Sequence, residues 1–325
     1  MISLDDMVKA QQKDTNPYKV SVVITCYNQE LYIAKALDSV LAQKTSFPYR
    51  IIVSDDASKD RSQEILKQYE ENYPGKMKVL YHENNQGTNQ NRNEALRICD
   101  TPYVAFLDGD DYWCDDQQLE RKYKFLEQNV NYIGYFTAGA RENDQTVNDF
   151  GKRGIEDPFD RRHALRNEYP GMYGGFFIRN MYKYMDPEEL TRYISYSLDE
   201  SSKMPIVAGI IGDVYRGEAA TTWIYRPVEG SLSSREREQN GCKEYFLSRM
   251  NMKGMVFELF GLSMELDDQI DELLYQAFVT AVRRRTKENV DQFRYICRHG
   301  NYTKAGIGKI IFYRLVRSTM KSSFR

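Results

Sequence analysis

The sequence predicts an α/β fold built on a mostly parallel sheet with helices on both faces, followed by a C-terminal helical region. Between residues 20 and 107, short apolar segments alternate with segments whose apolar residues recur at helical spacing. Such alternation is typical of parallel strands joined by right-handed helical crossovers. From about residue 240 to the end the pattern is helical and increasingly basic.

Four apolar runs predict the central strands of this sheet, at residues 20–26, 50–54, 77–81 and 103–107. The first, Val-Ser-Val-Val-Ile-Thr-Cys, has the β-branched composition of a central strand. Helical periodicity fills the gaps between the runs, at residues 31–41, 65–73 and 95–99. Ser58 or Asp60 is placed to cap the second helix. Residues 1–19 are polar and read as a lead-in.

The middle of the chain is less regular. Residues 132–137 and 221–225 are predicted strands, and residues 171–178 predict a glycine-rich loop that enters another strand. Residues 141–170 are charged and show no clear period.

Composition excludes several classes of protein. A net charge of -2 argues against a nucleic-acid-binding protein, and no apolar run is long enough to span a bilayer. The N-terminus lacks the basic start and apolar core of a signal peptide. The 5 cysteines include no Cys-x-x-Cys pair, which favours reduced thiols in a cytoplasmic protein. The 3 histidines are far apart, which argues against a histidine-based zinc site.

Polar clusters follow each predicted strand of the first half, at residues 25–30, 54–58, 84–93 and 108–111. Ligands of open parallel sheets bind beyond the carboxyl ends of the strands. Because all four clusters fall at such ends, we expect them to form one site.

The last cluster holds Asp108, Asp110 and Asp111 around Gly109. Asp108 and Asp110 point the same way if strand geometry persists through the segment. Converging carboxylates repel each other unless a cation lies between them, and Mg²⁺ or Mn²⁺ carrying a diphosphate fits that demand. The alternative is an acidic turn exposed to solvent.

Taken together, these segments resemble family-two glycosyltransferases, which have the GT-A fold, a Rossmann-like α/β architecture. The resemblance covers roughly residues 18–125, and a short segment at 225–233 resembles the end of the family's catalytic domain. The family usually has proline where Thr25 stands. The matching stretches are residues 20–28 with Glu30, 39–43, 52–58 with Asp60, 85–87 with Arg92 and Asn93, and 106–113.

The resemblance implies roles for individual residues. Thr25, Tyr27 and Glu30 would line a nucleotide pocket, with Tyr27 beside the base. Asp56, or Asp55, would accept from the uracil N3–H. Arg92 would steady the diphosphate or the neighbouring carboxylates, and a purely structural ion pair with the 108–111 cluster is the alternative. Asp108 would approach the ribose and Asp110 would bind the metal.

Members of this kind are inverting enzymes, in which a carboxylate takes the proton of the acceptor hydroxyl. The family position of that base points to Asp199 or Glu200, with Asp213 and Asp186 as weaker candidates. A carboxylate there is also common at a helix start without any chemical role. We therefore expect a donor-binding half at residues 20–130, an acceptor half at 131–235 and a helical region at 236–325.

The implied function is transfer of a sugar, from a UDP-sugar by expectation, to a hydroxyl of a saccharide or lipid-linked saccharide during cell-surface polysaccharide synthesis. One alternative is a sugar-nucleotide nucleotidyltransferase, although the loop at 25–30 lacks the glycine-rich, basic character of a triphosphate loop. The other is a binding module without turnover. A homo-oligomer is left open.

Basic and apolar residues interleave along residues 304–325. This pattern favours peripheral contact with the inner face of the cytoplasmic membrane, where a lipid-linked acceptor would lie. The alternative is a helix that packs its apolar side on the protein.

Overall fold

The computed structural model describes residues 1–142, 158–168, 173–196, 198, 200–217, 222–226, 242–300 and 302–322. The chain divides into two compact units, Met1–Pro227 and Val228–Arg325. The expected boundary between residues 235 and 236 lies outside the described residues, as does most of the irregular 141–170 segment.

Seven of the described strands of the first unit form one sheet in the order β3-β2-β1-β4-β8-β6-β9. All neighbours are parallel except β8, which runs antiparallel to both β4 and β6. The strands are β1 Val20–Cys26, β2 Tyr49–Asp55, β3 Met77–Tyr81, β4 Tyr103–Asp108, β6 Tyr132–Phe136, β8 Phe176–Arg179 and β9 Asp213–Arg216. The predicted apolar runs therefore became strands within one or two residues of the expected ends.

A second, three-stranded sheet has the order β5-β10-β7. Its strands are β5 Tyr112–Trp113, β7 Gly139–Arg141 and β10 Trp223–Tyr225. Because β5 follows β4 after only a few residues, this small sheet begins directly beside the end of the central sheet. It brings residues near 140 and 225 to the same edge.

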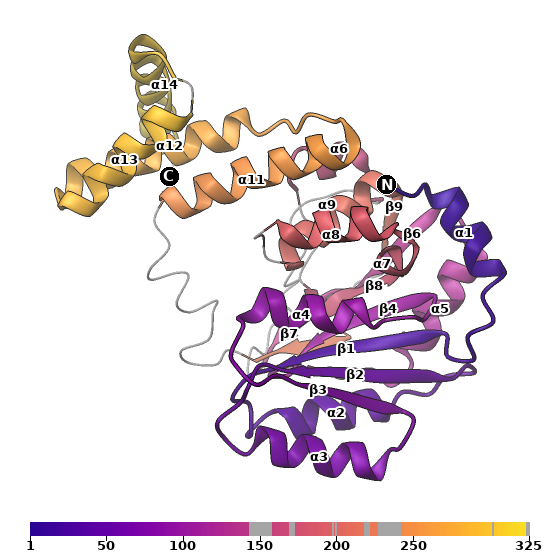
Figure 1. The fold of residues 1–325 in the computed structure, drawn as a ribbon. Coiled ribbons are helices and arrows are strands. Elements are labelled where there is room, and N and C mark those ends of the chain that lie inside the picture. Colours follow the sequence, from indigo (N-terminus) through magenta and orange to yellow (C-terminus); the bar gives the residue numbers. More distant parts are fainter. Residues whose placement is uncertain are drawn as a thin grey trace. The chain divides into compact units, whose positions relative to one another are not determined.

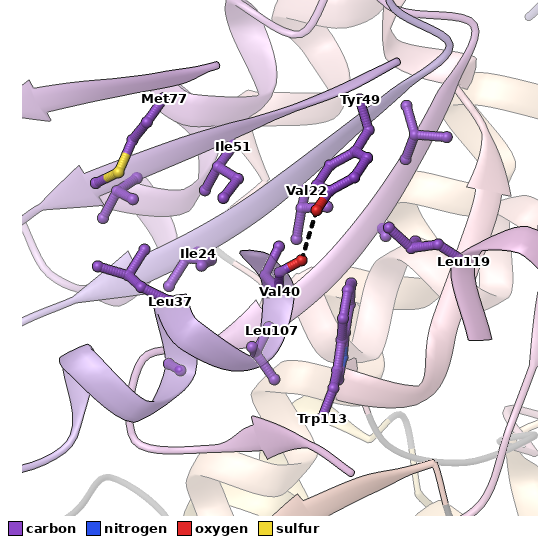
Figure 2. Close-up of a cluster of buried hydrophobic side chains, with 14 of the residues drawn as sticks. Val22, Ile24, Leu37, Val40, Tyr49, Ile51, Met77, Leu107, Trp113 and Leu119 are labelled. Carbon is purple, nitrogen blue, oxygen red and sulfur yellow. Dashed lines mark hydrogen bonds between the residues drawn. The ribbon is translucent and has the colours of Figure 1, made fainter. Parts of the chain in front are cut away.

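Helices cover both faces of the central sheet (Figure 1). Helices α2 Ile33–Leu41 and α3 Ser62–Asn72 lie on one face, and α4 Thr88–Arg97 lies on the other. The face under α2 holds a continuous apolar core in which Val22, Ile24 and Leu107 meet Leu37 and Val40 (Figure 2). Fully burying one such side chain is worth about 1.5–3 kcal/mol, so this core fixes β1 and β4 beneath α2.

The remaining helices of the first unit surround the second half of the sheet. They are α5 Gln118–Gln128, α6 Arg161–Leu165, the short 3₁₀ turn η1 Tyr173–Gly175, α7 Met181–Tyr184, α8 Pro187–Ser195 and α9 Glu200–Ile211.

The lead-in contains a helix that the polar sequence did not predict, α1 Leu4–Gln12. Ser3 caps it by accepting from the Asp6 N–H, and Met7 is fully buried. Gln11 donates to the Pro102 carbonyl at 2.6 Å, which fixes the helix at the start of β4. One apolar anchor among polar residues gives almost no periodic signal, which explains the difference.

Of the two residues predicted to cap the second helix, Asp60 binds its first N–H and Ser58 does not. Helix α3 begins after Arg61, which makes no side-chain cap. Asp60 accepts from the Ser62 N–H at 3.0 Å, whereas Ser58 is bound to Asp55 instead.

The second unit is helical, as expected. Its described residues form the helices α11 Cys242–Phe260, α12 Asp267–Arg284, α13 Lys287–His299 and α14 Lys304–Ser322. Among the described residues, no helix combines the length and the apolar character needed to cross a bilayer.

Candidate active site

The candidate site lies at the carboxyl ends of β1, β2 and β4. The chain passes from β1 outward through β2 to β3 and then returns to place β4 on the other side of β1. In open α/β sheets ligands bind at this reversal of strand order. Thr25 of β1 pairs with Asp108 of β4 and with Ser54 of β2, so the predicted polar clusters meet there.

Thr25, Arg92 and Asp108 contact one another directly. The Thr25 hydroxyl donates to Asp108 Oδ1 at 3.1 Å, and Arg92 donates to the same oxygen at 2.7 Å. Helix α4 supplies Arg92, whose side chain is 4% exposed and whose guanidinium lies 4.0 Å from the centre of the Tyr173 ring. The structure thus contains the ion pair that the sequence left open.

Residues 108–111 form a tight turn, which we call the carboxylate turn. The Asp111 N–H donates to the Asp108 carbonyl, and the Gly109 N–H donates to the Thr25 carbonyl. A Cβ at Gly109 would lie 2.3 Å from Gln29 Oε1 and 2.8 Å from the Thr25 carbonyl oxygen, so only glycine fits. Because β4 ends at Asp108, the strand alternation used to align Asp108 with Asp110 does not apply; the turn sets the direction of Asp110 instead.

The carboxylate turn concentrates more negative charge than its surroundings offset. Burial and the nearby Asp108 carboxylate raise the pKa of Asp110 to about 6, despite Arg226 and Arg92. Burial, together with Asp110 and Asp108, also raises the pKa of Asp111 well above its usual range. A bound cation would relieve this repulsion.

Asp55, the last residue of β2, and Asp56, the residue after it, are both buried and hold the surrounding backbone. Asp55 accepts from the Ser58 N–H at 3.1 Å and from Gln63 at 2.7 Å. Asp56 accepts from the N–H groups of Gln86 and Gly87 at 2.7 and 2.9 Å. Gln86 and Gly87 lie directly before α4, so Asp56 helps to fix the helix that carries Arg92.

Tyr27 and Glu30 lie on the loop after β1. Tyr27 is 46% exposed, as a residue whose ring is available to a ligand would be. Glu30 accepts from the Arg61 N–H at 2.8 Å, so its carboxylate faces the start of α3. Both residues follow Thr25 closely in the chain and so lie at the same edge of the sheet.

The structure describes the four candidate bases to different extents. Asp199 lies outside the described residues, and Glu200 begins α9 but its side chain is not described. Asp186 caps α8 by accepting from the Glu188 and Glu189 N–H groups. Asp213 is the first residue of β9, which runs parallel to β6. It therefore lies at the amino-terminal end of its strand, whereas the carboxylate turn lies at the carboxyl end of β4.

Sequence reasoning gave no role to Arg226 and Glu142, which the structure brings to the carboxylate turn. The Arg226 N–H donates to Asp111 Oδ1 at 2.9 Å, and its guanidinium donates to the Asp110 carbonyl at 3.0 Å and to Glu142 at 2.9 Å. The family-like segment beginning at Tyr225 was the signal that could have pointed to Arg226.

A divalent ion fits this site only if the ligand itself supplies part of the coordination. Among the described residues, no group of three histidine, cysteine, aspartate or glutamate side chains is arranged to hold a metal. Mg²⁺-type sites commonly use one or two carboxylates and complete their shell with water and substrate phosphates. Asp108 Oδ1 is already occupied by Arg92 and Thr25, which leaves Asp110 as the better-placed ligand.

Comparison with known proteins is consistent with this geometry. Residues 21–186, just over half of the chain, match the family described as Glycosyl transferase family 2. The chain belongs to this glycosyltransferase family. The predicted family is therefore confirmed.

Curated relatives match a shorter segment. An uncharacterized protein of Mycobacterium tuberculosis is 38% identical over 109 residues, which cover 34% of this chain and 32% of that protein. The poly(ribitol-phosphate) beta-glucosyltransferase of Bacillus spizizenii is 38% identical over 116 residues, covering 35% of this chain and 18% of that enzyme. The match thus spans a third or less of each of these relatives.

Among solved structures, the chain is similar to residues 1–349 of S. aureus TarS in complex with UDP-GlcNAc. The TM-score is 0.61 at 17% identity, and the match covers 86% of this chain and 79% of the other. This similarity confirms the predicted α/β GT-A fold.

Proposed function

We propose that this chain is an inverting glycosyltransferase that moves a sugar from a UDP-sugar to a hydroxyl of a saccharide or lipid-linked saccharide in cell-surface polysaccharide synthesis. The observation that carries the proposal is the convergence of Thr25, Arg92 and Asp108 with Asp110 at the reversal of strand order. Membership of the glycosyltransferase family supports the reaction class. The UDP-GlcNAc bound by TarS and the poly(ribitol-phosphate) acceptor in the name of the Bacillus relative support the donor and the cell-surface role.

The donor nucleotide would bind along the ends of β1 and β2. Tyr27 would lie beside the base, and Thr25 and Glu30 would line the pocket. Asp56, or Asp55, would accept from the uracil N3–H, because a carboxylate oxygen that already accepts one hydrogen bond keeps a second lone pair. Asp108 would approach the ribose. Arg92 would keep Asp108 in place and offset charge near the diphosphate.

Asp110 would hold a Mn²⁺ or Mg²⁺ ion together with the donor diphosphate. When bound, such an ion neutralises the charge that develops on the departing nucleotide. The raised pKa of Asp110 supports this assignment, because repulsion between neighbouring carboxylates favours a cation beside them.

Asp199 or Glu200 would be the general base, taking the proton of the acceptor hydroxyl as its oxygen attacks the anomeric carbon. Attack opposite the departing nucleotide inverts that carbon. The position of Glu200 at the start of α9 agrees with the family location of the base.

Helix α14 would contact an anionic membrane surface, placing the protein peripherally on the inner face of the cytoplasmic membrane. The helix carries five basic residues and no acidic residue. Arg314 pairs with Glu272 at 3.0 Å and so faces α12, whereas Phe312 and Tyr313 are 70% and 62% exposed. An exposed aromatic pair among basic residues suits shallow insertion between anionic headgroups.

A thermal-shift screen of nucleotides and UDP-sugars, with and without Mn²⁺, tests the donor assignment. Binding to the folded state alone raises the melting temperature. Stabilisation by UDP and a UDP-sugar that requires Mn²⁺ supports the proposal; stabilisation by nucleoside triphosphates alone would favour the nucleotidyltransferase. Release of UDP from the stabilising donor distinguishes an active enzyme from a binding module.

A further inference from the structure

The carboxylate turn is held from two sides. Its near side is fixed by the central sheet, through the Thr25 carbonyl and the Thr25 and Arg92 side chains. Its other side is fixed by Arg226, the residue directly after β10 of the small sheet.

Arg226 reaches the turn at two separate points. Its main-chain N–H donates to the Asp111 carboxylate, and its guanidinium donates to the Asp110 carbonyl. The two bonds therefore bracket the peptide unit between Asp110 and Asp111. The Asp110 side chain leaves the backbone directly before this peptide unit and directly after Gly109, whose N–H is held by the Thr25 carbonyl. Anchors on both sides of its Cα therefore restrict the direction in which its carboxylate can face.

Glu142 in turn orients Arg226. Its carboxylate accepts from Arg226 Nε at 2.9 Å, and its own N–H donates to the Tyr225 carbonyl at 2.9 Å, which aligns β7 with β10. The Lys35 ammonium lies 3.4 Å from the same carboxylate. Burial opposes ionisation of Glu142, but Arg226 and Lys35 lower its pKa, so the charge that holds Arg226 is present at neutral pH.

Two rings shield this arrangement. The Arg226 guanidinium lies 4.8 Å from the centre of the Tyr32 ring and 5.2 Å from that of Tyr112, and Arg226 is 9% exposed. A planar guanidinium that donates to both the Asp110 carbonyl and Glu142 and contacts two rings is pre-organised in a way that a lysine ammonium cannot reproduce.

We infer that Arg226, oriented by Glu142, is a positioning residue that sets the Asp110 carboxylate for the divalent ion of the donor complex. The inference rests on the proposed function. Arg226 acts through the carboxylate turn and needs no contact with the donor. The small sheet accordingly serves the donor site, because it carries both Arg226 and Glu142 to the turn.

The test compares Arg226→Lys and Glu142→Gln with the wild-type chain. Glu142→Gln keeps an oxygen that can accept from Arg226 but removes the charge. Arg50→Lys is a matched control, because Arg50 also pairs with a carboxylate, Asp100, but lies near the start of β2, at the opposite end of the strands from the carboxylate turn. The Mn²⁺ affinity is measured by electron paramagnetic resonance at saturating UDP. UDP affinity without metal and thermal unfolding are measured in parallel.

Loss of a residue that orients a metal ligand typically costs 10- to 100-fold in metal affinity. We expect Arg226→Lys to weaken Mn²⁺ binding at least ~10-fold with UDP affinity in the absence of metal unchanged. Glu142→Gln should give a smaller loss in the same direction, and Arg50→Lys none. A merely structural role would lower the melting temperature without this selective loss.

Wild-type Mn²⁺ affinity in Arg226→Lys would overturn the inference and leave the proposed function standing. An equal loss of Mn²⁺ affinity in Arg50→Lys would do the same. If Arg226→Lys does not fold, unchanged Mn²⁺ affinity in Glu142→Gln is the overturning result. Failure of the wild-type chain to bind UDP in a metal-dependent way contradicts the proposed function and removes the inference with it.

Discussion

The Arg92 guanidinium donates to Asp108 Oδ1 at 2.7 Å, joining the middle of α4 to the last residue of β4. Arg92 is almost fully buried, while the Asp108 side chain is 34% exposed. The carboxylate of this pair is therefore accessible at the site, whereas the guanidinium is buried within the protein. This arrangement offsets one of the three charges of the carboxylate turn from within the fold.

Arg92→Met is expected to destabilise the chain at neutral pH. The substitution leaves the Asp108 carboxylate without its cation next to Asp110, and an unpaired polar group of this kind costs about 1–3 kcal/mol. Urea unfolding at pH 7.5 measures the loss. In the double variant with Asp108→Asn much of the loss should disappear, because the stranded charge is gone. Equal destabilisation in the single and double variants would contradict the pairing.

Asp110 should make the unliganded protein less stable as the pH rises. Its pKa is raised from 3.8 to about 6 in the folded state, so between these values the folded chain binds more protons than the unfolded chain. Stability is then lost as the pH rises through about 6. Asp110→Asn removes this effect and should be more stable than wild type at pH 7.5, by about 1–3 kcal/mol. Denaturation at pH 4 and pH 7.5 checks this: a difference between the two proteins that does not shrink at pH 4 would refute the prediction.

The base is tested by Asp199→Asn and Glu200→Gln. Replacing the true base should lower turnover at least ~100-fold while donor binding is kept. Transfer to an added acceptor and UDP affinity are measured for each variant. Near-normal turnover in both variants would mean that the base lies elsewhere in the chain.

Helix α14 should support salt-sensitive binding to anionic lipid. Each basic residue near such a surface contributes about 1 kcal/mol, and salt weakens the attraction. Flotation with anionic and neutral liposomes compares the full chain, a chain truncated after Tyr302, and Phe312→Ser with Tyr313→Ser. Phe257→Ser is the matched control, because Phe257 is 63% exposed on α11.

We expect the full chain and the Phe257 control to float with anionic liposomes, and the truncated and α14 variants to float less. Equal flotation of the full and truncated chains, or none with anionic lipid, would reject the membrane role. Helix α14 would then be interpreted as a packing element.

The strands of the donor half were predictable because each is a buried apolar run with a polar cluster at its end. Residues 20–26 and 77–81 became β1 and β3 with the expected bounds. The meeting of Thr25 with Asp108 also followed from topology, because parallel strands bring their carboxyl ends to one edge.

The direction of Asp110 was not predictable in the same way. It depends on a turn that ends the strand alternation and on Arg226, which lies 116 residues further along the chain. No local pattern encodes a contact between such distant residues. Helix α1 was missed for a different reason, since a single buried anchor, Met7, lies in an otherwise polar segment.

The most direct test of the central claim is calorimetry of UDP binding with and without Mn²⁺, in the wild-type chain and in Asp110→Asn. We expect Mn²⁺ to strengthen UDP binding by the wild-type chain, because Asp110 and the diphosphate would share the ion. In Asp110→Asn this Mn²⁺-dependent gain should be lost, while binding without metal stays the same. A full Mn²⁺-dependent gain in Asp110→Asn, or none in the wild-type chain, would contradict the assignment of Asp110 as the metal ligand of the donor site.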